Sequence, residues 1–396
     1  MKRDVVVSGI GLVSVLGEEL QDYTALFDGL PQKSLTEALG PFLIHPLCNL
    51  SFEKQIPRKG DQRQMEVWQR IGVYTAGLAL LNSNLAGQAE LLSKTHMIIA
   101  ADGGERDETV DNALMSGIRF ASDRGAYLNE RLMGSLRPTL FLAQLTNLLA
   151  GNISIIHGVT GSSRSFMGEE AAGVSAIRTL YARIASGQVE LGLVGAANNA
   201  ARKDLALNYA FGGALFKPPY LPVWSRGQTH AGVIPGSMGA FLVLEEREHA
   251  LARGAKIFAR ITYAASDRCA RLPGEAKKNL EQLYKGLKPQ LKGEQLAVLS
   301  CASGVAPITQ EEEEFWHSRQ KEVVLRAIGS LIGHGPCAQA PFACALAALA
   351  LDANRFFVPF EEKERALSSA QQIIISSAGH WRGEGMLLLE QESDHA

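Results

Sequence analysis

The sequence predicts an α/β fold built from two similar halves, and three observations support this class. Short β-rich runs alternate with longer stretches of helical periodicity. The 396 residues are 46% hydrophobic and 20% charged, which is typical of a chain that buries a large core. A charged segment, 245–254, separates two stretches with the same order of strands and helices. We therefore expect an N-terminal half over 1–250 and a C-terminal half over 251–396.

The individual elements are expected to follow one another as strand and helix along both halves. The first half is predicted to contain strands at 5–10, 97–101, 153–156 and 191–194, and helices at 20–28, 67–85, 140–149 and 171–186. The charged segment reads as a helix closed by Gly254. The second half is predicted to contain strands at 257–261, 296–300, 323–328 and 372–377, and a helix at 341–351. This order favours a parallel or mixed sheet covered by helices, and an internal duplication without a residue-level repeat.

The charge distribution excludes several classes of partner. The formal net charge is −2 and the basic residues are scattered, so we expect no nucleic-acid partner. The basic residues Lys2 and Arg3 precede an apolar run, as in a signal peptide, but Gly9, Gly11 and Ser14 interrupt that run, and we interpret it as the first strand. No stretch approaches the roughly 20 apolar residues that cross a bilayer. We expect a cytoplasmic protein without a membrane partner.

Cysteine usage and the single charge run both favour structural interpretations. The five cysteines are odd in number and contain no CxxC pair, which predicts buried thiols rather than disulfides or a zinc site: Cys48, Cys269, Cys301, Cys337 and Cys344. Neither a cofactor nor a metal is expected. The acidic run 311–314 is interpreted as the solvated start of a helix, where carboxylates favour the positive end of the dipole.

Several segments, taken together and in the same order, resemble the β-ketoacyl-acyl-carrier-protein synthase family. They span nearly the whole chain and cover residues 5–17, 138–155, 171–177, 186–195, 224–246 and 249–257. The resemblance implies the thiolase-like fold, with five layers in the order α-β-α-β-α. It also implies dimerisation through the strand that precedes the nucleophile, here about residues 162–166.

The same resemblance locates four positions of the family's reaction centre, and three of them have lost the expected residue. The family's nucleophilic cysteine lies where a helix N-terminus lowers its pKa, and this position is Glu170. The first of two catalytic histidines is replaced by Ser303, and the lysine is replaced by Gly329. The second histidine is retained as His334 in Gly333-His334. Acyl transfer through a thioester is therefore excluded at this position.

Two interpretations remain open at these positions. Glu170 is either a helix-start charge that fills a disused pocket, or a mimic of the glutamine found here in chain-length factors and in decarboxylating ketosynthases. His334 is either a histidine packed in the core or a retained family histidine that still has a function. In the family's glycine-rich gating loop, here 376–385, the phenylalanines are missing, and His380 and Trp381 are expected to plug the entrance or an interface.

The chain keeps the segments of the family's scaffold but has lost most of its catalytic residues, and this combination favours a chain-length factor. Such a subunit is inactive alone, but pairs with an active ketosynthase paralogue in a heterodimeric β-ketoacyl-acyl-carrier-protein synthase, an acyltransferase that elongates polyketide, polyene or fatty-acyl chains. The helix at 140–149 and the segment 107–120 would shape the partner's acyl tunnel, and simple core packing is the alternative for their large residues. The gate candidates, together with the two loop residues, are Met115, Phe120, Phe141, Leu145, His380 and Trp381. The short form and divergent loops favour an aryl polyene system.

Two rival functions are kept. The first is a malonyl-carrier decarboxylase that uses Glu170, His334 and His380. A carboxylate lacks the N–H donor of glutamine and carries a charge, which disfavours decarboxylation of an anionic malonyl group. The second rival is a ligand-binding or scaffold protein without a ketosynthase partner. Co-purification with a ketosynthase would separate these possibilities.

Overall fold

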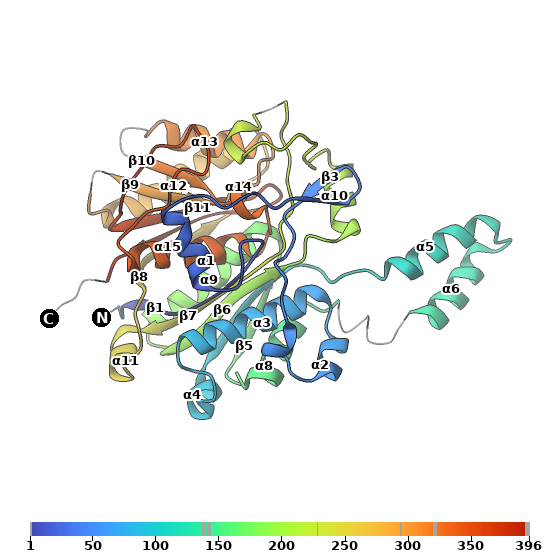
Figure 1. Ribbon diagram of the computed structural model, residues 1–396, viewed down its shortest axis with the longest axis horizontal. Helices are drawn as coiled ribbons and strands as arrows, with labels where there is room; N and C mark the ends of the chain where they lie inside the picture. Colours follow the sequence, from blue (N-terminus) through green and yellow to red (C-terminus); the bar gives the residue numbers. More distant parts are fainter. Residues whose placement is uncertain are drawn as a thin grey trace.

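A ten-stranded mixed sheet forms the centre of the computed structural model, which describes residues 2–136, 140, 144–227, 229–293, 295–319 and 323–392 (Figure 1). Its strands are β1 Val5–Val13, β4 His96–Ala101, β5 Ser163–Met167, β6 Leu191–Asn198, β7 Met238–Glu246, β8 Ala259–Asp267, β9 Leu296–Ser300, β10 Val323–Ala327, β11 Gln372–Ala378 and β12 Glu384–Glu390. A separate two-stranded sheet pairs β2 Thr36–Leu39 with β3 Phe42–Ile44.

The helices connect these strands and cover them. They are α1 Leu20–Thr24, α2 Lys59–Gln64, α3 Val67–Asn82, α4 Ala89–Lys94, α5 Glu108–Gly117, α6 Arg124–Ser135, α8 Leu148–His157, α9 Glu169–Ala185, α10 Lys203–Phe211, α11 Arg247–Ala252, α12 Glu275–Leu287, α13 Ile308–His317, α14 Gly329–Ile332 and α15 Gln339–Asp352. No helix among the described residues is long and apolar enough to cross a membrane.

The strand order repeats between the two ends of the large sheet. The full order is β10-β9-β11-β12-β8-β1-β7-β6-β4-β5. In each half, the first strand in sequence pairs antiparallel with the fifth and the fifth with the fourth, and the remaining pairs are parallel. The halves join where β1 pairs antiparallel with β8. The two halves thus have the same strand topology, as expected. The boundary at residue 250 stays a prediction, because both halves share one sheet.

Three apolar clusters define five layers. The largest cluster lies between the two halves of the sheet and encloses α9 and α15, which pack against each other and against strands of both halves. A second cluster places α3 and α8 on the outer face of the first half-sheet. A third places α12 and α13 on the outer face of the second. The predicted α-β-α-β-α arrangement from two similar halves is confirmed.

Close approach of α9 and α15 depends on small residues. Gly173 on α9 lies so near the start of α15 that a Cβ there would come within 2.4 Å of the carbonyl oxygen of Cys337. Residues 339–351 of α15 are all buried, and alanine is their most frequent residue. Packing at this density tolerates no added methyl group. The two central helices are therefore closely packed against each other.

The predicted strand at 153–156 is wrong, because these residues belong to α8. Leu149 and Ile153 are buried on the side that packs against α3, whereas Ile155 is 75% exposed, which is a helical rather than an alternating pattern. The strand that precedes α9 is β5, close to the expected 162–166. Of the predicted helix at 140–149, only Leu148 and Leu149 lie in α8, and residues 141–143 lie outside the described residues.

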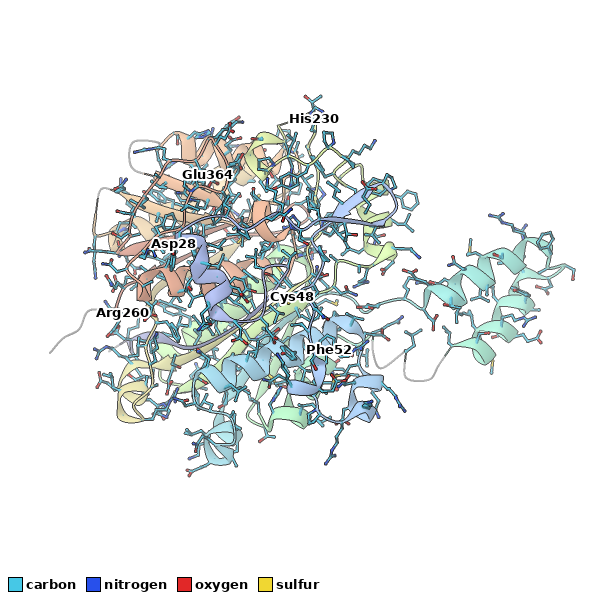
Figure 2. All side chains as sticks on the ribbon, in the orientation of Figure 1. Asp28, Cys48, Phe52, His230, Arg260 and Glu364 are labelled. Atoms are coloured by element: carbon cyan, nitrogen blue, oxygen red, sulfur yellow. The ribbon has the colours of Figure 1, made fainter. Side chains whose placement is uncertain are left out.

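Helices α5 and α6 form an arm, residues 107–136, that extends from the body (Figure 1). The carboxylate of Asp107 accepts the Val110 amide and caps α5, and that of Asp123 accepts two amides at the start of α6. Most of the arm extends away from the body (Figure 2), and at its base Glu108 of α5 pairs with Lys203 of α10. Leu114 alone among the described residues of the arm is buried. Capping and amphipathicity therefore form these helices without support from the main core.

The acidic run 311–314 is not a solvated helix start, which corrects the prediction. Glu311 and Glu312 are buried on α13. The Glu311 carboxylate accepts the amides of Gly274 and Lys277 and so caps α12, while Glu312 accepts two buried serine hydroxyl groups. Four consecutive helical residues span more than a full turn, so that some of them must face the core.

Candidate functional site

Glu170 occupies the second position of α9, directly after a strained turn from β5. The turn uses Gly168 at φ +124° and Glu169 at φ +24°. A non-glycine residue with positive φ is costly and persists only where surrounding structure imposes it. The turn directs the Glu170 side chain into the interior, where the residue is 3% exposed. Its carboxylate thus lies at the positive end of the α9 dipole.

The Glu170 carboxylate contacts groups from two other elements. Its Oε1 lies 3.4 Å from His334 Nε2 and accepts the backbone N–H of His380 at 3.0 Å. Oε2 has no hydrogen-bond partner among the described residues. Burial alone would raise the pKa of Glu170, but His334 and the backbone N–H groups of Glu170 and His380 hold that pKa below its ordinary value. The carboxylate is therefore ionised and held in place.

The structure brings Glu170 and His334 together but gives Ser303 and Gly329 other contacts. The Ser303 hydroxyl accepts the Val305 amide, and the Ser303 carbonyl accepts an N–H of the Arg226 guanidinium. Gly329 begins α14, and a Cβ there would meet the Ala302 carbonyl oxygen at 3.1 Å. No hydrogen bond joins Ser303 or Gly329 to Glu170 in the described part of the chain. Ser303 and Gly329 therefore contact other parts of the chain and not the Glu170 carboxylate.

Cys337, predicted from the sequence only to be a buried thiol, lies next to the site. Its Sγ donates to Asp102 Oδ1 at 2.8 Å and approaches the Glu169 carbonyl oxygen at 3.4 Å. Burial raises the pKa of the Cys337 thiol well above its ordinary value, and the nearby carboxyl groups raise it further. A protonated, hydrogen-bonded thiol is a poor nucleophile. Cys337 therefore does not replace the missing cysteine, although its place three residues after His334 was a usable signal.

All five cysteines are free, as their number and spacing predict. Cys301, Cys337 and Cys344 are buried, while Cys48 and Cys269 are partly exposed, so burial is correct for three of the five. In the ranges that the structure describes, no group of three His, Cys, Asp or Glu side chains is arranged to hold a metal ion.

The turn between β11 and β12 closes one side of the site. The Trp381 ring stacks on Tyr209 with ring centroids 4.5 Å apart and planes 16° apart. His380 lines a cavity of about 400 Å³ together with residues that include Lys217, His230, Val305 and Ala306. Figure 2 shows His230 at the upper edge of the molecule. His380 thus lines the cavity and also donates its amide to the Glu170 carboxylate, whereas Trp381 packs on Tyr209, and their role as a plug stays a prediction.

The gate candidates of the arm are exposed rather than packed in the core. Met115 is 63% exposed and Phe120 is 90% exposed, so core packing is wrong for both residues. Leu145 is 37% exposed and belongs to no helix. Phe141 lies outside the described residues. Met115, Phe120 and Leu145 are not among the lining residues of the described cavity at His380, and their role as gate residues stays a prediction.

Comparison with known proteins gives consistent matches. The family described as "Beta-ketoacyl synthase, N-terminal domain" matches residues 44–250, just over half of the chain. The 3-oxoacyl-[acyl-carrier-protein] synthase 2 of Vibrio harveyi is 24% identical over 275 residues, which are 66% of this chain. The chain spans 62% of the length of that relative.

Two solved structures cover almost the whole chain. The ishigamide ketosynthase/chain length factor matches with a TM-score of 0.79 and 18% identity, over 99% of this chain and 100% of the matched chain. A type II polyketide synthase acyl-carrier protein in complex with its ketosynthase bound to the hexaketide matches with a TM-score of 0.72 and 19% identity, over the same shares. At these identities the likeness establishes the fold, which is thiolase-like.

Proposed function

Because the chain belongs to the β-ketoacyl synthase family, we propose that it is a non-catalytic chain-length-factor subunit of a condensing enzyme. The observation that carries the proposal is the buried Glu170 at the position of the family's nucleophile. A carboxylate at this helix start is ionised and forms no thioester. The thiol of Cys337 is protonated and bonded to Asp102. The chain keeps the family fold although it lacks the nucleophile, as expected of a subunit whose function depends on its shape and not on catalysis.

The proposed partner is an active ketosynthase paralogue, which would supply the acyl chemistry and contact an acyl carrier protein. The strand β5 lies at one end of the sheet and pairs only with β4 among the described strands, so its free edge can pair with a second subunit. Met167 on β5 and Ile155 on α8 are both more than 70% exposed beside this edge. Apolar side chains next to an open strand edge are typical of a subunit contact.

The arm supports a role in shaping the partner's acyl tunnel. Its exposed apolar residues include Met115, Phe120 and Met133. An arm that buries one residue in its own chain gains stability by packing against another subunit. We propose that Met115 and Phe120 limit the length of the partner's acyl chain, in a polyketide or fatty-acyl pathway such as that of aryl polyenes. The chain itself would occupy the cytoplasm with its partner.

A malonyl-carrier decarboxylase remains the second candidate, because the structure places Glu170 and His334 in contact. Two observations disfavour it. The carboxylate accepts hydrogen bonds and offers no donor to a developing enolate. The turn that carries His380 separates Glu170 from the cavity.

Co-expression tests the proposal. The chain is produced alone and with ketosynthase paralogues that retain their cysteine, and assembly is measured by native mass spectrometry. Product length is then compared for the natural chain, Phe120→Ala and the matched control Phe211→Ala, which removes an equally exposed phenylalanine from α10. We expect a heterodimer and longer products with Phe120→Ala only. A homodimer that releases carbon dioxide from malonyl-carrier, and stops doing so with Glu170→Ala, would overturn the proposal.

A further inference from the structure

The turn 378–383, between β11 and β12, is tightly closed on itself. The Gly379 amide donates to the Gly383 carbonyl oxygen at 2.8 Å, and Gly383 has φ +83°. A Cβ on Gly379 would come within 2.3 Å of the Arg382 carbonyl oxygen and 2.9 Å of Glu170 Oε2. Only glycine fits between these groups. The turn therefore lies directly against the Glu170 carboxylate.

Side chains from three other segments of the chain hold this turn in place. The Glu170 carboxylate accepts the His380 amide at 3.0 Å, and Arg271 Nε donates to the His380 carbonyl oxygen at 3.3 Å. Arg271 is itself paired with the buried Glu384 at 2.7 Å. On the other side, the Trp381 ring stacks on the buried ring of Tyr209. Both backbone groups of His380 are thus bonded to side chains that come from outside the turn.

We infer that Glu170 acts as a latch that holds the turn 378–383 closed over the buried His334 and Cys337. The carboxylate that replaces the nucleophile is the acceptor that the His380 amide requires. A hydrogen bond to a charged acceptor is stronger than one to a neutral acceptor. Both Glu170 and Cys337 are almost fully shielded from solvent in this state.

The latch has a consequence for ligands that enter the cavity beside the turn. This cavity of about 400 Å³ reaches His380 and does not include Glu170, His334 or Cys337 among its lining residues. A ligand in the cavity therefore meets the imidazole of His380 instead of the former reaction centre. This inference concerns the chain alone and does not require the proposed pairing with a ketosynthase.

Amide exchange and thiol alkylation on the full chain without a partner test the latch. We expect Glu170→Ala to accelerate hydrogen exchange at the His380 amide by about tenfold or more. We expect Cys337 to react faster with iodoacetamide, while Cys344, which is buried on α15, stays unreactive and reports that the chain is folded. Glu170→Gln keeps an acceptor oxygen and should leave both rates within about threefold of the natural chain.

Three outcomes would overturn the inference. In a folded Glu170→Ala chain, an unchanged His380 exchange rate would show that the carboxylate does not hold the turn. Equal acceleration in Glu170→Gln and Glu170→Ala would show that the hydrogen bond is not the cause. If Glu170→Ala unfolds and all three buried thiols react, Glu170→Asp takes its place, since it keeps the charge but withdraws the carboxylate from the His380 amide by one methylene group; an unchanged exchange rate at His380 in that variant would also overturn the inference. None of these measurements depends on a ketosynthase, so a failed latch and a failed pairing are distinguishable.

Discussion

Replacing Glu312 with glutamine is expected to remove a pH dependence from the stability of the chain. Glu312 lies on α13 and is fully buried. Its Oε1 accepts the hydroxyl groups of Ser300 at 2.9 Å and Ser376 at 2.6 Å, and its Oε2 has no partner among the described residues. Burial raises the pKa of Glu312 from its ordinary 4.5 to about 7, although both hydroxyl groups lower it. The folded carboxyl therefore keeps its proton in a range where the unfolded chain has lost it.

The size and sign of the effect follow from this pKa difference. A raised pKa contributes stability that is fully present below pH 4.5 and is lost as the pH rises through 7. Each pKa unit corresponds to about 1.4 kcal/mol. Because part of the change lies below pH 5, the window from pH 5 to pH 8 captures about 2.5 kcal/mol of it. The free energy of unfolding of the natural chain should fall by this amount relative to Glu312→Gln.

Urea unfolding followed by circular dichroism at pH 5 and pH 8 measures this difference. Glu314→Gln is the matched control, because its carboxylate belongs to the same run but is 64% exposed, and its replacement should change stability by under about 0.5 kcal/mol at either pH. At pH 8 the Glu312→Gln chain should be more stable relative to the natural chain than at pH 5. If the difference between these two chains is the same at both pH values, Glu312 is not protonated in the folded state and the reasoning fails.

Three further predictions concern the core, the arm and the site. Glu245→Gln should lower the free energy of unfolding by about 3 kcal/mol in a urea titration, because the buried Glu245 carboxylate pairs with two nitrogens of Arg253. A decrease in the free energy of unfolding of less than about 0.5 kcal/mol would contradict this prediction. The arm variants Phe120→Ser and Met133→Ser should leave the urea midpoint unchanged, since both side chains are more than 80% exposed. Each variant should weaken binding to a ketosynthase partner about tenfold, measured by calorimetry. Unchanged affinity would show that the arm does not contact the partner. Glu170→Cys combined with Ser303→His should not restore condensation of malonyl-carrier, measured by mass spectrometry of the carrier protein, because Gly329 leaves no lysine beside the site; any extended product would refute this.

Most of the secondary structure was predictable, because strands and helices of this chain carry strong local patterns. The runs at 5–10, 97–101 and 296–300 became β1, β4 and β9 with similar bounds. The run at 153–156 misled because its isoleucines suit a strand locally, whereas packing of Leu149 and Ile153 against α3 imposes a helix. At residues 153–156, the burial of apolar side chains therefore determined the secondary structure more strongly than strand propensity did.

The candidate site was only partly predictable. The sequence located Glu170 and His334 at motif positions 164 residues apart, but could not tell whether they touch. Asp102 directly follows β4, Cys337 lies two residues before α15, and the two side chains are hydrogen-bonded to each other. Neither residue carries a local pattern that relates it to the other, since their contact depends on how the two central helices pack.

By itself, the sequence determined the α/β class, the similar halves, the resemblance to a condensing enzyme and the absence of its thiol, because each of these is written in local composition, periodicity or a short motif. Only the tertiary structure decided which acidic residues are buried, that the arm stands apart from the body, and that the Glu170 carboxylate binds the His380 amide. The physical reason is that these features depend on groups distant in sequence that meet at fixed distances. A carboxylate is a surface charge or a buried latch according to the neighbours that the fold brings to it.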